Sequence, residues 1–285
     1  MTETVYLNGA FVPRSDAKIS ALDYGFLFGY GLFETMRAYN GTVFRLDNHL
    51  ARLAKPAVKL SIPVEPGVLR NAVAETVRLN GLKEARVRLT VAIGEGSLVP
   101  DPHSCAKPTI LVVAAKYTPY APEIYERGFR VMVSSLRRNS QSPLTVMKTA
   151  NYLENLLARE EARTAAFDDA LLLNEKGQLA EASTSNIFLV SKNTLRTPSV
   201  ESGILPGITR DVILELASEL GIKTAEAAIR PEELRAAQEA FLTNSMIEVM
   251  PLSMVDGETV GSGKPGTVTR RLMTAYRDLV IKETG

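Results

Sequence analysis

The sequence predicts an α+β protein with two domains, and three observations lead to this prediction. The chain has 285 residues, which exceeds the usual size of one domain. Residues 116–122 contain two prolines and no hydrophobic periodicity, so they are the best linker candidate. Beyond them the order is strand, helix and then several strands, which favours a curled sheet over a doubly wound parallel one. We expect an N-terminal α/β domain at 1–115, a linker at 116–122 and a C-terminal domain at 123–285.

Composition excludes several classes of protein. Lys and Arg total 33 against 32 Asp and Glu, and this net charge of +1 argues against nucleic-acid binding. No apolar run is long enough to span a bilayer, and the first residues lack the pattern of a signal peptide. We therefore predict a cytoplasmic protein with no membrane partner. One cysteine excludes an internal disulfide, and two histidines poorly supply a zinc site or a Ser-His-Asp triad, so we expect no metal.

The first half of the chain predicts two hairpins, two helices and two further strands. The hairpins cover 5–12 and 31–46, each with an Asn-Gly turn, and the helices begin at 47 and span 66–80. The strand at 85–93 alternates: its odd positions from Val87 to Ile93 are apolar, while Arg86, Arg88 and Thr90 share the other face. Two arginines on one face need an acidic group opposite. For Arg88 this is either a substrate carboxylate or a neighbouring acidic side chain.

The second half predicts more strands, at 129–136, 170–173, 179–182, 187–190 and 240–242, with helices at 208–220, 231–238 and 268–280. A further helix is predicted from the absence of Gly and Pro between 148 and 169. Its apolar positions include Leu153, Leu156 and Leu157, which we expect to form a buried stripe. Lys148 stands just ahead of this helix and could project into a cleft, although most lysines are solvated surface charges.

Two polar segments are candidates for binding an anion. Residues 207–209 open a helix with backbone N–H groups and a hydroxyl, which suits a phosphate, although a plain N-cap by Thr209 is the simpler interpretation. The trio at 243–245 could likewise cap a helix or hold an anion.

Five motifs in order resemble the class IV aminotransferase family, the pyridoxal-phosphate enzymes of fold type IV. They are HLARL at 49–53, KTANY at 148–152, EASTSNIF at 181–188, LPGITR at 205–210, and TNS at 243–245 followed by EVMP at 248–251. The resemblance covers nearly the whole chain. That family includes branched-chain aminotransferases, D-amino-acid aminotransferases, (R)-amine transaminases and aminodeoxychorismate lyases.

The resemblance implies a cofactor, pyridoxal 5′-phosphate, and a role for each matched residue. Lys148 would form the aldimine with the cofactor aldehyde and later carry the proton between substrate and cofactor. Glu181 would keep the pyridine nitrogen protonated, and Tyr152 would hydrogen-bond the ring oxygen. The phosphate and its surroundings would be held by a larger set: Arg52, Ile208, Thr209, Asn244 and Ser245.

The family's architecture follows as an expectation. It has a smaller N-terminal α/β domain and a larger C-terminal domain with a barrel-like sheet, with the cofactor between them. Members are at least homodimers, and the aromatic segment 24–33 of one subunit commonly helps to close its neighbour's pocket. We therefore expect a homodimer or a higher homo-oligomer.

The sequence indicates more than one activity within the family. Arg88 and the segment 37–39 match branched-chain aminotransferases, whereas Thr35 and Ser245 look more like aminodeoxychorismate lyases. We predict a transferase that moves an amino group between an amino acid or amine, with the branched-chain aliphatic kind as the first expectation, and a 2-oxo acid. The alternatives are the lyase, which forms 4-aminobenzoate and pyruvate, and a non-catalytic cofactor-binding protein. The substrate would meet Phe28, Phe33, Thr35 and Arg88. Ile93, where D-amino-acid enzymes have an arginine, argues against a D-amino-acid specialist.

Overall fold

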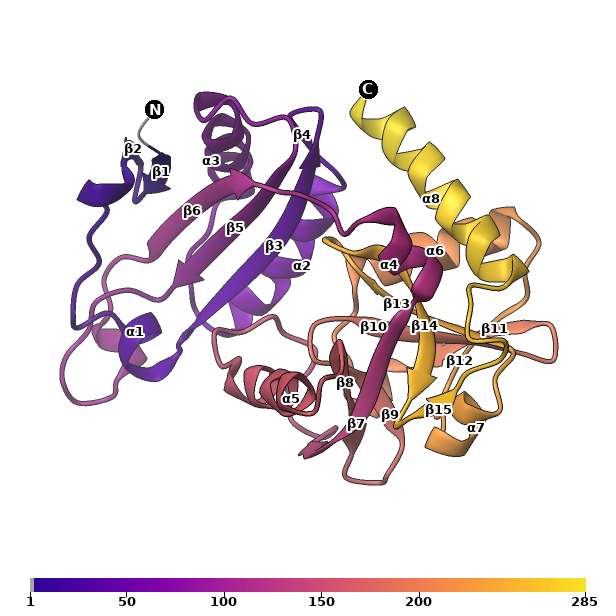
Figure 1. Ribbon diagram of the computed structural model, residues 1–285. Coiled ribbons are helices and arrows are strands. Elements are labelled where there is room, and N and C mark those ends of the chain that lie inside the picture. Colours follow the sequence, from indigo (N-terminus) through magenta and orange to yellow (C-terminus); the bar gives the residue numbers. More distant parts are fainter. Residues whose placement is uncertain (1–2) are drawn as a thin grey trace. The chain divides into compact units, whose positions relative to one another are not determined.

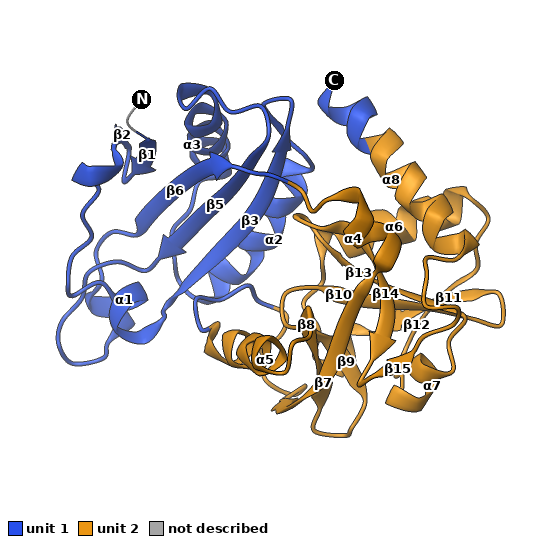
Figure 2. Cartoon of the chain, in the orientation of Figure 1, with its two compact units in different colours: residues 1–118, 147–151, 280–285 blue, residues 119–146, 152–279 orange. Residues whose placement is uncertain are grey.

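The computed structural model describes residues 3–285 and divides them into two compact units, each with its own sheet (Figure 2). The first unit contains the described residues up to Thr118 together with Met147–Asn151 and Val280–Gly285. The second contains Pro119–Val146 and Tyr152–Leu279. The domain boundaries predicted from the sequence stay a prediction.

The first unit is built on a six-stranded antiparallel sheet in the order β2-β1-β6-β5-β3-β4 (Figure 1). Its strands are β1 (Thr4–Leu7), β2 (Ala10–Pro13), β3 (Gly31–Tyr39), β4 (Thr42–Val43), β5 (Ala85–Ala92) and β6 (Thr109–Lys116). Both predicted hairpins are present. Asn8 and Asn40 take φ values of 48° and 49°, as their tight turns require. β4 is shorter than predicted because the chain turns into a helix at Leu46.

One face of this sheet carries the hydrophobic core. The helices α2 (Leu46–Lys59) and α3 (Pro66–Leu79) pack there, and Val87, Leu89 and Val91 of β5 are fully buried beneath them, as the alternation predicted. The register pairs Phe33 with Thr90 and Thr35 with Arg88. These four residues therefore share the sheet face that does not carry the helices.

The aromatic segment 24–33 contains a short helix, α1 (Tyr24–Phe28). The Asp23 side chain accepts a hydrogen bond from Gly25 N at its start, and Gly29 ends it in the left-handed conformation. Phe26 is 77% exposed at this helix.

The second unit contains a nine-stranded, mostly antiparallel sheet that curls. Its strands are β7 (Phe129–Arg138), β8 (Asp169–Asn174), β9 (Leu179–Ala182), β10 (Asn186–Ser191), β11 (Thr194–Pro198), β12 (Thr224–Ala227), β13 (Glu239–Asn244), β14 (Glu248–Val255) and β15 (Glu258–Thr259). In Figure 1, β10 and β11 run across the direction of β7 and β14. This curled sheet confirms the predicted α+β class. Its helices are α4 (Pro122–Arg127), α5 (Leu153–Thr164), α6 (Ile208–Glu219), α7 (Pro231–Arg235) and α8 (Thr267–Thr284).

The helix predicted to run unbroken from 148 to 169 is wrong in extent. α5 spans only Leu153–Thr164, because residues 148–150 are extended and bond to the start of β3. The expected buried stripe is also wrong: Leu153, Leu156 and Leu157 are 67%, 55% and 50% exposed.

Small and polar residues form the buried face of α5 instead. Asn155, Ala158 and Ala162 face the sheet, and the two alanines pack with Ala170 and Leu172 of β8. Small side chains allow the helix to lie close to the strands, so the leucines remain on the outer face. We call Leu153, Leu156 and Leu157 the α5 leucine face. Among the helices of residues 3–285, none is long and apolar enough to cross a membrane.

Candidate active site

Lys148 is anchored by the sheet of the first unit. Phe33 N donates to Lys148 O at 2.8 Å, and Ala150 N donates to Gly31 O at 2.8 Å, so the lysine segment pairs with the start of β3. This pairing brings Lys148 Nζ to 4.6 Å from the centroid of the Phe33 ring. The amine is thus held over an aromatic face by a strand, not by a helix.

A buried carboxylate lies on the helix-covered face of the same strand. Glu34 is 0% exposed, and both of its oxygens meet side chains of α2. Arg52 Nε and Nη2 donate to these two oxygens at 2.9 and 2.6 Å, and His49 Nδ1 lies 2.7 Å from Oε2. Glu34 therefore takes one edge of the Arg52 guanidinium, and an anion bound by Arg52 would meet its remaining N–H groups.

The titration of this cluster follows from burial and charge. Burial alone would raise the pKa of Glu34, but the Arg52 charge and the His49 hydrogen bond outweigh it and lower that pKa to about 2. Burial lowers the pKa of His49, and the charges of Arg52 and Lys148 lower it further. The hydrogen bond and charge of Glu34 raise this pKa but do not outweigh the other effects. At neutral pH the carboxylate is therefore ionised and the imidazole is neutral, so Nδ1 is the donor.

Arg88 stacks on the same aromatic ring as Lys148. Its guanidinium carbon lies 3.5 Å from the Phe33 centroid, and its Nε donates to Thr90 Oγ1 at 3.3 Å. Thr35 is its partner in the strand register. Stacking of this kind fixes the plane of a guanidinium, which can then present its outer edge to a carboxylate. Phe28, the remaining predicted substrate residue, lies in α1 and is 43% exposed. Its ring packs edge-on against Tyr24.

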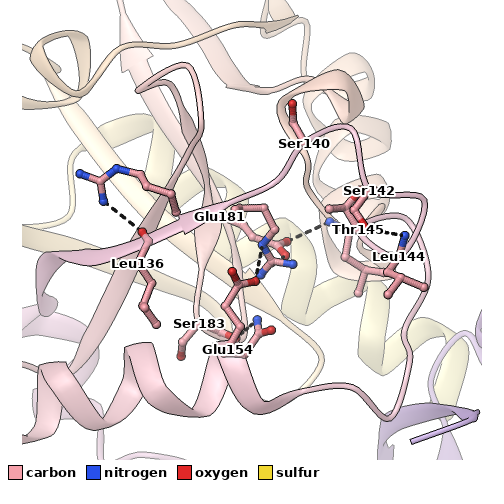
Figure 3. Close-up of polar contacts among 12 residues, drawn as sticks. Leu136, Ser140, Ser142, Leu144, Thr145, Glu154, Glu181 and Ser183 are labelled. Carbon is pink, nitrogen blue, oxygen red and sulfur yellow. Dashed lines mark hydrogen bonds and ion pairs between the residues drawn. The ribbon is translucent and has the colours of Figure 1, made fainter. Parts of the chain in front are cut away.

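Glu181, on β9 of the second unit, is held from three directions. Leu205 N donates to its Oε2 at 3.0 Å, Asn186 Nδ2 lies 3.2 Å from the same oxygen, and Arg138 Nη2 lies 3.3 Å from Oε1. Arg138 Nε also lies 3.7 Å from Glu154 Oε2, and Figure 3 shows Glu154 and Glu181 close to each other. Glu181 is 6% exposed. A carboxyl group is thus fixed in a buried position, which suits a protonated ring nitrogen.

The N-terminus of α6 fits an anion. Gly207 is the N-cap, and no side chain caps the helix, so Thr209 is not the N-cap. Ile208 and Thr209 are 8% and 3% exposed, and their backbone N–H groups belong to the first turn, where α-helical partners are missing. The start of α6 therefore offers backbone N–H donors to an anion.

Tyr152 belongs to a chain of hydrogen bonds that ends at a buried acid. Its hydroxyl lies 3.2 Å from Ser183 O, which also accepts from Asn155 Nδ2 at 2.7 Å. The Ser183 hydroxyl donates to Asp169, and burial raises the pKa of Asp169. Figure 3 shows Ser183 beneath the sheet, at the level of α5. The chain fixes the position of the tyrosine hydroxyl.

Asn244 organises a turn. Its Nδ2 donates to Thr184 O at 3.1 Å and Ser185 Oγ at 2.9 Å, and its Oδ1 accepts from Met246 N and Ile247 N. These bonds shape the segment that contains Ser245. The predicted contacts of Asn244 and Ser245 with the cofactor stay predictions.

Several residues were not predicted as site residues. The first unit brings together Phe33, Arg88 and Lys148 as expected, but it adds Glu34 and His49. The second adds Arg138 and Asn186 around Glu181. The position of Glu34 offered one signal, since an acid between Leu32 and Met36 shares their core-facing side of the strand.

The chain is similar to known proteins over nearly its whole length. The family "Amino-transferase class IV" matches residues 31–255. A protein of Methanocaldococcus jannaschii named "Putative branched-chain-amino-acid aminotransferase" is 40% identical over 98% of this chain and 96% of its own. An aminodeoxychorismate lyase of Bacillus subtilis is 32% identical over 96% of this chain and 93% of its own. A solved branched-chain amino acid aminotransferase of Escherichia coli is 32% identical, covers 100% of this chain and 97% of its own, and has a TM-score of 0.94.

The chain therefore belongs to the class IV aminotransferase family, as its motifs predicted. The family holds enzymes with different reactions on one fold, so the reaction has to be inferred from the site.

Proposed function

We propose that the protein is a pyridoxal-phosphate-dependent transaminase that exchanges an amino group between a branched-chain-like aliphatic amino acid and a 2-oxo acid. The observation that carries this proposal is the placement of Lys148, a primary amine fixed by backbone pairing beside Phe33. A protein that only stores the cofactor has no need of an amine held in this way. The names of the relatives favour amino-acid and 2-oxo acid substrates.

The residues present fit this cofactor. Pyridoxal phosphate supplies an aldehyde that combines with amines and a protonated ring that accepts the electrons of the cleaved bond. Glu181 would accept a hydrogen bond from the ring nitrogen and keep it protonated. Arg52, the first N–H groups of α6 and Ser245 would bind the phosphate, with Asn244 shaping the turn that carries Ser245. Lys148 would carry the proton between the substrate α-carbon and the cofactor.

Tyr152 would hold the ring oxygen of the cofactor with its single hydroxyl proton. That proton can go either to Ser183 O or to a ligand, so ligand binding would turn the hydroxyl away from the carbonyl. Asn155 Nδ2, 2.7 Å from the same carbonyl, would keep it satisfied after the turn. The tyrosine can therefore change partners without leaving a buried carbonyl unpaired.

The substrate would contact the sheet face of Phe33, Thr35 and Arg88, with Phe28 nearby in sequence at α1. Phe28, which is 43% exposed, would supply an apolar surface for an aliphatic side chain, whereas Phe33 is 2% exposed and holds Arg88 and Lys148 against its ring. Arg88, stacked on the same ring, supplies a charge for the second carboxylate of a dicarboxylic acceptor. One pocket can accept both kinds of partner in this way.

A second candidate function is the aminodeoxychorismate lyase. It is favoured by Thr35, which lies beside Arg88 in the register, and by Ser245, since both match the lyase pattern. The two functions separate by product: a transaminase converts 2-oxo acids to amino acids, whereas the lyase releases pyruvate.

The test combines a covalent label with a substrate panel. Sodium borohydride added to the purified protein with pyridoxal phosphate should fix the cofactor on Lys148, located by peptide mass spectrometry, and Lys148→Ala should abolish turnover. Branched-chain and other amino donors are then tried with 2-oxoglutarate and pyruvate, beside an assay for pyruvate release from aminodeoxychorismate. Label elsewhere would end the lysine assignment. Pyruvate release without any transamination would give the function to the lyase.

We also propose a homodimer. The α5 leucine face places three large apolar side chains on the surface of the second unit, and such a contiguous patch is typical of an interface. Phe26 of α1 is a further exposed aromatic in the first unit. The predicted cytoplasmic location stays a prediction.

A further inference from the structure

Asn186, the first residue of β10, forms hydrogen bonds to two functional segments. Its Nδ2 lies 2.8 Å from Leu205 O and 3.2 Å from Glu181 Oε2. Both partners are acceptors, which identifies the atom as the amide nitrogen. Leu205 N donates to the same Glu181 oxygen at 3.0 Å. Glu181, Asn186 and Leu205 thus form a closed ring of hydrogen bonds, and Asn186 is 5% exposed within it.

The neighbouring glycine gives a second, independent observation. Gly207 has φ −82° and ψ 135°, a conformation open to any residue, so the backbone does not require glycine. Space does: a Cβ on Gly207 would lie 2.0 Å from Asn186 Oδ1. The Asn186 amide therefore fills the volume that a side chain at 207 would occupy, and it lies directly against the N-cap of α6.

We propose that Asn186 is a positioning residue that ties the Glu181 carboxylate to the 205–207 segment, so that the ring nitrogen and the phosphate of the cofactor are received at a fixed separation. The inference rests on the proposed function, because it assigns Glu181 to the nitrogen and the α6 N-terminus to the phosphate. Neither end of the cofactor touches Asn186 in this scheme.

The physical reason is preorganisation. A ligand with two recognition groups gains from both only if the protein already holds their partners at the matching distance. Without the amide, Glu181 and the 205–207 segment could shift relative to each other. A ligand bound at one end would then lose part of the second interaction, while a ligand with only one of the two groups would lose little.

The experiment compares two ligands that differ by one phosphate. Dissociation constants of pyridoxal 5′-phosphate and pyridoxal are measured by absorbance and fluorescence for the wild type, Asn186→Asp and Asn186→Ala. Asn186→Asp keeps the size of the side chain but replaces the Nδ2 donor with a carboxylate oxygen, which would face two other acceptors, Glu181 Oε2 and Leu205 O. Thr197→Val is the matched control, since it removes a buried hydrogen bond from Thr197 Oγ1 to Ile187 O on β10 without touching Glu181 or 205–207. Thermal unfolding of each protein without ligand measures its fold stability.

The Kd of pyridoxal divided by the Kd of pyridoxal 5′-phosphate is the ratio that reports the contribution of the phosphate in each protein. We expect this ratio to fall on the order of tenfold in both Asn186 variants, which matches the loss of one or two hydrogen bonds, and to stay unchanged in Thr197→Val. Equal losses for both ligands would assign Asn186 a purely structural role and overturn the inference. A wild type that binds neither ligand would overturn the proposed function itself, and the inference with it.

A double variant tests the contact with Gly207. Gly207→Ala should displace the Asn186 amide and lower the ratio, whereas adding Gly207→Ala to Asn186→Ala should cause little further loss, because the clash has gone. Independent, additive losses would show that residue 207 acts without Asn186 and would contradict the proposed tie. If the Ala variants do not fold, the Asn186→Asp protein alone decides the outcome.

Discussion

At the scale of single residues, the notable feature is a buried charge pair that neutralises itself. Glu34 has no exposed surface, and Arg52 and His49 satisfy its oxygens. A guanidinium would be costly to bury alone, and the ionised Glu34 offsets that cost. The pair thus allows Arg52 to be largely buried in the folded protein.

Replacing Glu34 should therefore destabilise the fold strongly. Glu34→Gln keeps the shape but leaves the buried Arg52 charge uncompensated, and we expect a loss of about 3 kcal/mol in the free energy of unfolding. Urea unfolding at pH 7 without cofactor measures it. Glu75→Gln, which breaks an exposed pair with Arg78, is the control and should cost far less, because solvent screens exposed ion pairs. Equal losses in the two variants would contradict the role of burial.

His49 should make stability depend on pH below neutrality. Its pKa is lowered in the folded protein, so between pH 6.5 and that lower pKa the unfolded chain binds a proton that the folded one does not. Stability should fall as the pH falls, by up to about 1.4 kcal/mol per pH unit, and His49→Asn should flatten the slope. Glu34 adds no slope there, because its contribution is complete above pH 4.5 and is lost only toward pH 2. An unchanged slope in His49→Asn would rule out this origin.

Arg88 should distinguish acceptors by their charge. A charge-assisted hydrogen bond to the second carboxylate of 2-oxoglutarate contributes roughly 1.5–3 kcal/mol, so Arg88→Leu should raise KM for this acceptor about tenfold to hundredfold. An acceptor with an aliphatic side chain should lose little. Arg86→Leu, an exposed position on the same strand face, is the matched control. Equal effects on both acceptors would instead indicate that Arg88 only holds Phe33 in place.

At the scale of elements, the sequence predicted correctly where a hydrophobic pattern faces a single core, and it failed where contacts with other elements decide which residues are buried. The alternation of β5 was sufficient because helices cover one face of its sheet. The pattern of α5 was not sufficient to predict its buried face, since its alanines pack on the sheet and its leucines face outward. Residues 148–152 read as helical, yet pairing with β3 keeps 148–150 extended. β11 and β12 were missed because charged and polar residues, such as Arg196 and Glu226, interrupt their apolar pattern. β14 was missed although it is mostly apolar, since it contains Pro251, which argues against a central strand.

The candidate site divides in the same way. Its motif residues were found from the resemblance, but the residues that hold them were not. Arg138 and Asn155 are ordinary polar residues in the sequence, and Asn186 stands in the 181–188 motif without a role of its own. Only the folded chain shows that they contact Glu181 or the Ser183 carbonyl.

The α5 leucine face should decide the assembly. Leu156→Glu places a charge in the centre of the patch, and we expect it to convert the dimer to a monomer, measured by analytical ultracentrifugation. Val58→Glu, at an 80% exposed position on α2, is the control and should leave the mass unchanged. A Leu156→Glu protein of unaltered mass would place the interface elsewhere.

At the scale of the whole molecule, the chain is not divided into two successive halves. Residues 147–151, with Lys148, belong to the first unit although they lie between two segments of the second, and the end of α8, Val280–Gly285, also belongs to the first unit although it follows the second. Within the first unit, Arg45 pairs with Glu283 at 3.0 Å and Asn40 Nδ2 donates to Gly285 O at 2.8 Å. Val280 and Thr284 are buried.

These late residues have a consequence for how the protein is made. On a ribosome, the segment up to residue 118 emerges well before residues 147–151 and 280–285. The unit that begins the chain therefore lacks residues 147–151 until the first part of the other unit has been synthesised, and it lacks its last helical turn until all of that unit has been synthesised. N-terminal domains usually fold first during translation. In this protein the first unit can be completed only after the second has been synthesised. A nascent chain halted before residue 280 would therefore expose an incomplete first unit to chaperones.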